Sequence, residues 1–226
     1  MNEEASRFTI ESRGFPPPWR WRDLGGKGRV RPGRVYRSAR LDRYESSVLR
    51  PFLAEKQIRT VVDLRNDQDL LEHHYESGAL EGIRYVNLQF RSNYRGPPDV
   101  LSPVERLREI YLTVIDDPAF PGWVSGLLEE ISGPGNLPLV FHCDEGAHRT
   151  GMLAAMLLNL AEATDREIVD DYLITAGQVR EEYIEALLIR LRSEGGARRY
   201  LISEGLPESL IDRAIEGMTA QSLPGC

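Results

Sequence analysis

The sequence predicts an α/β fold, in which a central, mostly parallel β-sheet is flanked by helices and the C-terminal half is helical. Short β-branched runs at 59–65, 83–90 and 138–142 are typical of buried strands. Longer segments between and after them carry apolar residues at helical spacing. The chain has 226 residues, of which 41% are hydrophobic and 28% charged, so we expect a single globular domain over residues 1–226.

The first part of the chain is rich in Arg, Gly and Pro and predicts turns with short strands. We expect strands at 8–12 and 34–38. A helix is expected over 46–56, where Pro51 marks its start or a kink. The polar segment 91–100, with a glycine and two prolines, is either a cover over a site or a solvated surface loop.

Helices dominate the rest of the chain. Ser102 and Glu105 form a capping box with Pro103 at the first helical position, which predicts that a helix begins there. The segment 151–161 is apolar on nearly all sides, as expected of a central buried helix. Further helices are expected around 120–128, over 165–175 and from Pro207 to Met218.

Charge and cysteine content narrow the possible partners. A formal net charge of −7 argues against nucleic acid or an anionic membrane as the main partner. No run approaches the roughly 20 apolar residues that span a bilayer, and MNEEASRFTI lacks the features of a signal peptide. Cys143 and Cys226 are too few for a disulfide framework or a metal cluster. We expect a cytoplasmic monomer or homodimer without metal or cofactor, in which Cys226 has no role.

The stretch HCDEGAHRTG, residues 142–151, lies between a predicted strand and a predicted helix. Backbone N–H groups of such a loop, together with the helix N-terminus, can surround a tetrahedral anion. Arg149 adds a planar fork for two phosphate oxygens. The same positive field favours the thiolate of Cys143 and makes it a nucleophile. Gly146 supplies backbone that a side chain would obstruct, so the stretch predicts a phosphate-binding loop rather than an inert buried cysteine.

These residues predict two-step hydrolysis of a phosphomonoester. Cys143 attacks phosphorus to form a cysteinyl-phosphate, which water then cleaves. We expect His142 to orient the loop and the Thr150 hydroxyl to hydrogen-bond the departing sulfur. No metal is required, because Arg149 and the backbone amides neutralise the transition-state charge. The residues expected to contact the phosphate are Asp144, Glu145, Gly146, Ala147, His148 and Arg149.

With the motif HCxxGxxRTG, the chain resembles the protein tyrosine phosphatase superfamily, and within it the bacterial tyrosine and dual-specificity phosphatases. WRDLGG, GRVYRSARL, TVVDLR, IVDDYLIT and GGARRYLISEGLPESLI are similar to segments of the same family. The resemblance implies a tyrosine-phosphatase-like fold and activity on phosphotyrosine, in some relatives on phosphoserine, phosphothreonine or phosphoinositides. It implies that Cys143 is the nucleophile, Arg149 the phosphate binder and Thr150 the helper. Four further family positions are interpreted as turn and ion-pair residues: Asp23, Arg37, Asp63 and Arg65.

Inside the loop the chain departs from the family pattern. The nearest bacterial relatives have a lysine and an aspartate before the arginine, where this chain has Ala147 and His148. Loss of the lysine removes a positive charge, and Asp144 and Glu145 add negative charge nearby. On electrostatic grounds, both changes disfavour a polyanionic phosphoinositide as substrate.

The leaving group needs a proton, and several residues are candidates for the general acid. His148 occupies the position of the family's acid and titrates near neutral pH. In the dual-specificity branch the acid is an aspartate upstream of the cysteine, at an offset close to that of Asp116 and Asp117. Asp117 precedes a proline, however, and this pair is also typical of a helix N-cap. Asp144 and Asp63 are further alternatives.

Three functions fit this reading. The leading one is a phosphomonoesterase acting on phosphotyrosine or a similar aryl phosphate. The second is a phosphatase for a small phosphorylated metabolite, such as a sugar, a nucleotide or a biosynthetic intermediate. The third is a pseudophosphatase that binds phosphorylated partners without turnover, against which the intact Cys143, Arg149 and Thr150 argue.

Overall fold

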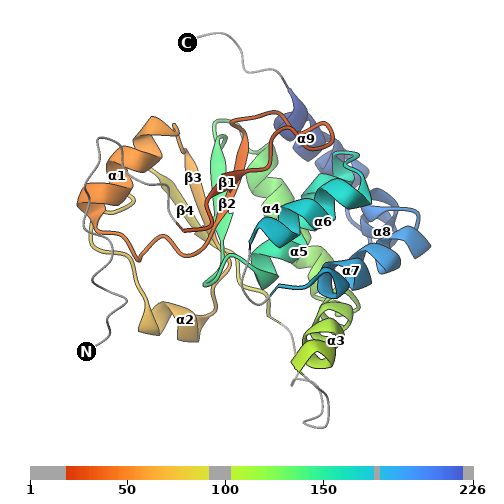
Figure 1. The fold of residues 1–226 in the computed structure, drawn as a ribbon. Coiled ribbons are helices and arrows are strands. Elements are labelled where there is room, and N and C mark those ends of the chain that lie inside the picture. The colour runs from red at the N-terminus through yellow and green to blue at the C-terminus, as the bar shows by residue number, and fades with distance from the viewer. Residues whose placement is uncertain (1–18, 92–102, 176–178, 221–226) are drawn as a thin grey trace.

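The computed structural model describes residues 19–91, 103–175 and 179–220, and within them the chain forms a β-sheet covered by helices on both faces (Figure 1). This arrangement confirms the predicted α/β class, with a mostly parallel sheet and a helical C-terminal half. The strand expected at 8–12 and the capping residue Ser102 lie outside the described residues.

The described sheet has five strands in the order β1-β2-β5-β3-β4, and β5 is its central strand. Every neighbouring pair is parallel except β1 and β2, which are antiparallel. The register places His142 at the end of β5 beside Ser38 of β2 and Asp63 of β3. The strand bounds are Arg22–Asp23 (β1), Val35–Ser38 (β2), Thr60–Asp63 (β3), Arg84–Asn87 (β4) and Leu139–His142 (β5).

The helices agree with most of the predicted segments. The first helix begins at Ser46 and contains Pro51 in its interior, so the proline does not mark its start. Among the helices of the described residues, none is long and apolar enough to cross a membrane. The bounds are Ser46–Glu55 (α1), Asp67–Glu72 (α2), Pro103–Ile115 (α3), Phe120–Ser132 (α4), His148–Leu160 (α5), Asp165–Ile174 (α6), Glu181–Ser193 (α7), Ala197–Ser203 (α8) and Glu208–Thr219 (α9).

The two faces of the sheet have separate hydrophobic cores. Figure 1 shows α1 and α2 on one side of the strands and α4 to α9 on the other. Side chains alternate along a strand, so Val140 of β5 packs with the α1 core whereas Leu139 and Phe141 belong to the larger core. The helix α5 lies inside the larger core and is buried from Thr150 through Leu158, as the sequence predicts.

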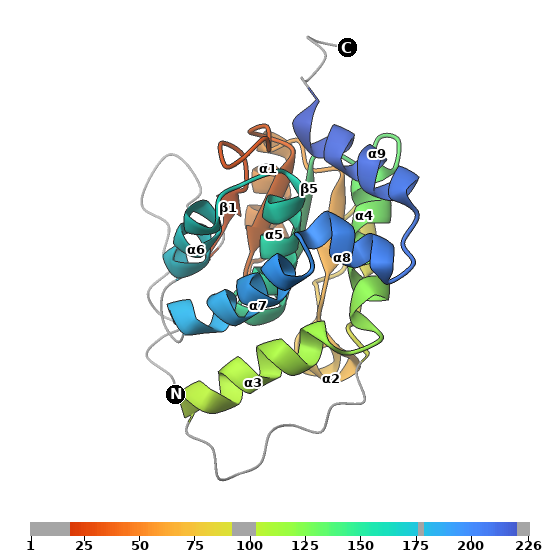
Figure 2. The same ribbon diagram turned by 90° about the vertical axis from the view of Figure 1, so that its right-hand side faces the viewer.

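The strands β2, β5 and β3 end at one edge of the sheet, and the segments that follow them gather there. The loop after β5 leads directly into α5, and α2 follows β3. Figure 2 shows α2 and α3 at the same end of the molecule. Because parallel strands place their carboxyl ends together, this edge is the expected place for a ligand site in such a fold.

Candidate active site

The loop between β5 and α5 places Cys143 at the end of the central strand and Arg149 in the first turn of α5. Cys143 is a free cysteine with 2% of its surface exposed. Gly146 has φ +66°, and a Cβ there would lie 2.5 Å from the carbonyl oxygen of Ser38. Glycine therefore lets the loop pack closely against the end of β2. The first N–H groups of α5 have no partner within the helix and are oriented to bind an anion.

Behind the loop, both ring nitrogens of His142 are engaged. Its Nε2 lies 2.6 Å from the hydroxyl of Tyr75, and its Nδ1 lies 3.1 Å from the carbonyl oxygen of Cys143. Burial lowers the pKa of His142, although the nearby Asp63 raises it. A neutral ring that donates from Nδ1 and accepts at Nε2 satisfies both contacts. His142 thus fixes the backbone at Cys143, which agrees with the loop-orienting role expected from the sequence.

A buried charge network lies next to His142. The Arg65 guanidinium donates to Asp63 at 2.7–3.0 Å and to Asp42 at 2.6 Å. The hydroxyl of Tyr85 donates to Asp63 at 3.1 Å. Arg65 and Asp63 are fully buried, so these hydrogen bonds satisfy charges that water does not reach. The network supports the interpretation of Asp63 and Arg65 as ion-pair residues.

Another buried arginine, Arg37, ties the loop to the helix α6. Its guanidinium lies 2.6 Å from an oxygen of Asp171 and donates to the carbonyl oxygen of Gly146 at 2.9 Å. Arg22 also pairs with Asp171, at 3.0 Å. Arg37 and Asp171 are both 1% exposed, so β2, α6 and the loop share one buried ion pair.

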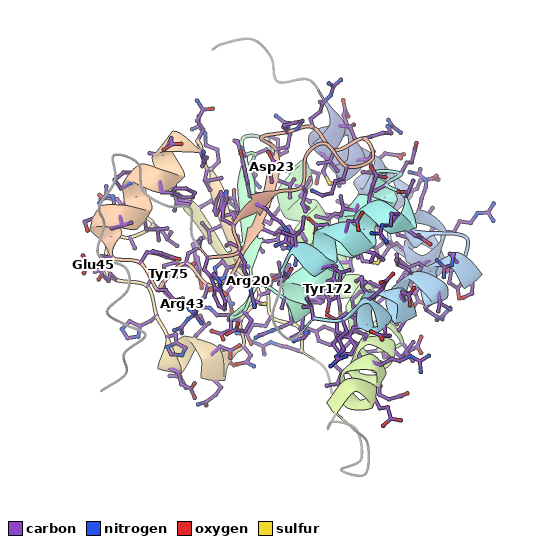
Figure 3. The ribbon with its side chains drawn as sticks, in the orientation of Figure 1. Arg20, Asp23, Arg43, Glu45, Tyr75 and Tyr172 are labelled. Carbon is purple, nitrogen blue, oxygen red and sulfur yellow. The ribbon has the colours of Figure 1, made fainter. Side chains whose placement is uncertain are left out.

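Asp23 lies far from the loop, toward the opposite end of the sheet (Figure 3). Its two carboxylate oxygens accept the backbone N–H groups of Gly25 and Gly33 at 2.7 and 2.6 Å. This geometry stabilises the turn between β1 and β2, as the sequence interpretation proposed.

Arg149 is held by a partner that the sequence analysis missed. One of its terminal nitrogens donates to Asp69 at 2.7 Å and to the carbonyl oxygen of Leu64 at 3.2 Å. Burial alone would lower the pKa of Arg149, but Cys143 and the ion pair with Asp69 raise it. Asp69 belongs to α2, directly after β3. The sequence contained a signal for it, since residues after a neighbouring parallel strand reach the same edge of the sheet.

The two acidic side chains of the loop are paired with arginines around its mouth. Asp144 lies 3.4 Å from Arg40, whose backbone N–H donates to the carbonyl oxygen of Asp144 at 3.0 Å. Glu145 lies 3.2 Å from Arg20 and 3.4 Å from Arg43. These cations offset the negative charge that the sequence placed in an anion-binding loop. The three arginines lie about 100 or more positions before the loop in the sequence, and the sequence analysis assigned none of them to the site.

An aromatic side chain lies between two of these arginines. The guanidinium groups of Arg20 and Arg43 lie 4.1 and 4.7 Å from the ring centre of Trp19. Figure 3 shows both arginines near the lower edge of the sheet, where the strands β2, β5 and β3 end. Trp19 is 39% exposed, so the mouth of the loop presents an accessible ring beside two cations.

His148 begins α5 and contacts a tyrosine of α3. Its Nδ1 lies 3.3 Å from the hydroxyl of Tyr111, and its Nε2 has no hydrogen-bond partner among the described residues. Burial lowers the pKa of His148, and the charges of Arg149 and Arg20 lower it further. An imidazole with one nitrogen fixed can give a proton from the other nitrogen when the ring is charged and take one there when the ring is neutral.

The other candidates for the general acid have different described contacts. Asp116 pairs with Arg190 of α7 at 3.0 Å, and Asp117 accepts the N–H of Ala119 at 2.8 Å, near the start of α4. Asp63 is paired with Arg65 and Asp144 with Arg40, as described above. Within the described residues, His148 therefore combines a place on the phosphate-binding loop with an unpaired ring nitrogen.

Two other predicted site residues are buried. Ala147 precedes α5 as its N-cap residue. The hydroxyl of Thr150 has no hydrogen-bond partner among the described residues.

The described part of the chain contains no cluster of three His, Cys, Asp or Glu side chains that could hold a metal ion. Most of the loop expected at 91–100 lies outside the described part of the chain.

The tyrosine phosphatase family matches residues 20–192. No match was found among the curated proteins.

Among solved structures, the Siw14 catalytic core is similar, with a TM-score of 0.50 and 18% identity over 80% of this chain and 88% of that one. The core domain of the PP-IP phosphatase SIW14 from S. cerevisiae gives 0.47 and 18%, over 80% and 96%. TpbA of P. aeruginosa gives 0.39 and 17%, over 81% and 86%. The first of these likenesses concerns the fold alone. Because the family match covers more than half of the chain, including the whole loop from Cys143 to Arg149, the chain belongs to the tyrosine phosphatase family of cysteine-dependent phosphatases.

Proposed function

We propose that the protein hydrolyses phosphomonoesters without a metal, through a cysteinyl-phosphate, and that its substrate is phosphotyrosine or a similar aryl phosphate. The observation that carries this proposal is the loop from Cys143 to Arg149. It sets a buried thiol beside a guanidinium at the N-terminus of α5. Such a site binds a phosphate dianion and presents it to a nucleophile.

In the first step, the Cys143 thiolate attacks phosphorus and the bond from phosphorus to the ester oxygen breaks. The departing oxygen takes the proton from Nε2 of protonated His148, which becomes neutral. Arg149 and the loop amides hold the phosphoryl oxygens, whose negative charge they offset in the transition state.

In the second step, water attacks the cysteinyl-phosphate and the sulfur–phosphorus bond breaks. Nε2 of His148 accepts the proton of the water, which restores the imidazolium and closes the cycle. The sulfur leaves as a thiolate. The Thr150 hydroxyl, buried and without another partner among the described residues, donates to that sulfur as it departs.

Two features of the mouth support an aryl phosphate as substrate. Trp19 offers an exposed ring on which an aromatic leaving group can stack. Arg20 and Arg43 are already paired with Glu145, which leaves less positive charge for a substrate that carries many phosphates. Neither feature excludes a small phosphorylated metabolite. A substrate panel distinguishes the two classes, and the cytoplasmic location and the monomeric or dimeric state stay predictions.

The first experiment compares phosphotyrosine peptides, p-nitrophenyl phosphate, sugar phosphates and nucleotides as substrates of the purified protein. We expect the highest kcat/KM on phosphotyrosine peptides. High turnover of one metabolite, with uniformly low rates on peptides, would replace the first function by the second. Cys143→Ser should abolish hydrolysis, whereas Cys226→Ser is the matched control and should leave it unchanged. Phosphopeptide binding without turnover by the unchanged protein would support a pseudophosphatase instead.

The role of His148 has its own test. His148→Ala should lower kcat/KM, which reports the first step alone, by about 10²–10⁴-fold on phenyl phosphate, whose leaving group needs a proton. The loss on p-nitrophenyl phosphate should be much smaller, because its leaving group departs as an anion. Equal losses on both substrates would remove His148 from the role of general acid.

A further inference from the structure

We propose that Tyr111 is a positioning residue for His148. In this proposal the Tyr111 oxygen accepts the Nδ1 hydrogen of His148, which keeps the neutral ring in one tautomer and leaves Nε2 to exchange the proton. The inference rests on the proposed function, in which His148 moves that proton. It adds a residue of α3 to the site.

The contact between the two residues is defined by two observations. The hydroxyl of Tyr111 lies 3.3 Å from Nδ1 of His148. The two rings also meet edge to face, with their centres 6.1 Å apart and an angle of 83° between their planes. Tyr111 has no exposed surface, so water does not compete for its hydroxyl.

Tyr111 is itself held in place by two more tyrosines. Its hydroxyl lies 2.7 Å from the hydroxyl of Tyr172 on α6, and its ring packs on Tyr183 of α7 at 6.0 Å. Tyr172 lies so close to α5 that a Cβ on Gly151 would come within 2.7 Å of its ring. Helices α5, α6 and α7 therefore fix the hydroxyl that meets His148.

The chemistry of the two steps decides the direction of these hydrogen bonds. Nε2 of His148 must give a proton in the first step and accept one in the second, so Nδ1 has to carry its hydrogen throughout. Burial raises the pKa of Tyr111 well above its ordinary value, and Tyr172 and Cys143 reinforce this shift. Tyr111 thus keeps its single hydrogen, which it donates to Tyr172, and its oxygen accepts from His148.

The hydrogen of a neutral histidine can lie on either ring nitrogen, and a partner at Nδ1 selects one of these two tautomers. An aspartate in the same position has no such tautomers and needs no such partner. The relatives that this loop resembles have aspartate at the position of His148. Among the charged groups near the pair, Arg149 and Arg20 oppose protonation of His148, and Arg37 lies near Tyr111. An oxygen that accepts from Nδ1 favours the imidazolium and partly offsets the effect of these arginines.

The test uses Tyr111→Phe, which keeps the ring and removes the hydroxyl. We expect kcat on phenyl phosphate to fall about 5–30-fold with KM changed less than about twofold, as for a lost hydrogen bond to a charged group. The loss of activity on the alkaline side of the pH profile should move to lower pH by about 0.5–1 unit. Tyr183→Phe is the matched control and should leave both unchanged, since its hydroxyl has no hydrogen bond among the described residues.

Two further measurements keep the proposal separate from the function on which it rests. In the His148→Ala background, Tyr111→Phe should cause no additional loss, whereas an undiminished loss would make Tyr111 a purely structural residue. Nitrogen NMR of labelled histidine reads the tautomer without any turnover. Hydrogen on Nδ1 of His148 supports the proposal, and hydrogen on Nε2 in the neutral ring overturns it. A failure of His148 as general acid would instead show in the leaving-group comparison described above.

Discussion

The residues behind the catalytic loop and those around its mouth both form ion pairs, but water reaches only one of the two groups. Behind the loop, Arg37 and Asp171 are each 1% exposed. At the mouth, Glu145 and Arg43 are 47% and 34% exposed. Removing one partner of a buried pair leaves an uncompensated charge, whereas an exposed pair contributes at most about 1 kcal/mol. The fold therefore fixes the loop from behind, and the mouth is adjustable at little cost in stability.

The largest effect is expected when the buried pair is broken. Asp171→Asn should lower the free energy of unfolding by about 3–5 kcal/mol, because Arg37 and Arg22 lose their shared carboxylate. The neighbouring Asp170→Asn is the control: it breaks an exposed pair with Arg166 and should cost less than about 0.5 kcal/mol. Denaturant titration measures both. Similar losses in the two variants would remove the distinction between the buried and the exposed pairs.

The second test concerns the close approach of the loop to β2. Gly146→Ala places a Cβ 2.5 Å from the carbonyl oxygen of Ser38, so loop or strand backbone must move. We expect a loss of about 2–3 kcal/mol in stability and about 10²-fold in kcat/KM, since a displaced phosphate-binding loop misplaces the substrate. Gly135→Ala shares the positive φ but meets no atom within 4 Å, so it should cost about 1–2 kcal/mol and leave kcat/KM unchanged. Unchanged kcat/KM in Gly146→Ala would contradict the packing argument.

A smaller effect is expected at the mouth, where Asp69 holds Arg149. Asp69→Asn should raise KM about 3–10-fold, because the guanidinium loses the carboxylate that orients it, while stability changes by less than about 1 kcal/mol. Asp67→Asn, on the same helix, removes a carboxylate that accepts from Gln89 and serves as control in steady-state kinetics. If KM falls instead, Asp69 competes with the phosphate rather than orienting Arg149.

The smallest expected effect is a dependence of stability on pH. Burial lowers the pKa of His142 below the value of about 6.5 that it has when unfolded, and burial acts in the same direction on His148. The unfolded chain thus binds protons that the folded protein does not. Stability is complete above about pH 6.5 and is lost as the pH falls through the lowered values. Denaturation curves from pH 7.5 to 5 should show this decline, and His142→Gln should weaken it. A flat curve would show that these rings are not held neutral.

The same contrast between buried and exposed residues explains part of what the sequence could predict of the fold. The strands around 34–38, 59–65 and 138–142 were recognisable because buried strands require β-branched and apolar runs. The helix α2 was missed because it buries none of its residues and so has no apolar face to detect. Burial is not the whole explanation, because α7 buries six of its residues and was not predicted individually either.

For the site, the sequence predicted the residues of the loop itself but not the side chains that contact the loop from other elements. The positions of Cys143, Gly146 and Arg149 follow from one contiguous motif. Asp69 could have been found, because it follows the neighbouring parallel strand β3, whereas Arg20 meets the motif only because the chain folds back to it. The hydroxyl of Tyr111 likewise matters only because α3 passes His148 in the folded protein.

The central claim, that Cys143 carries the phosphate between the two steps, can be measured directly. The protein is mixed with a phosphotyrosine peptide, denatured within milliseconds and digested, and the fragment with residues 143–149 is examined by mass spectrometry. We predict one phosphate on Cys143 of the wild type, and none in the fragment from Cys143→Ser. A phosphate on any other residue of the wild type, or continued turnover by Cys143→Ser, would contradict the account.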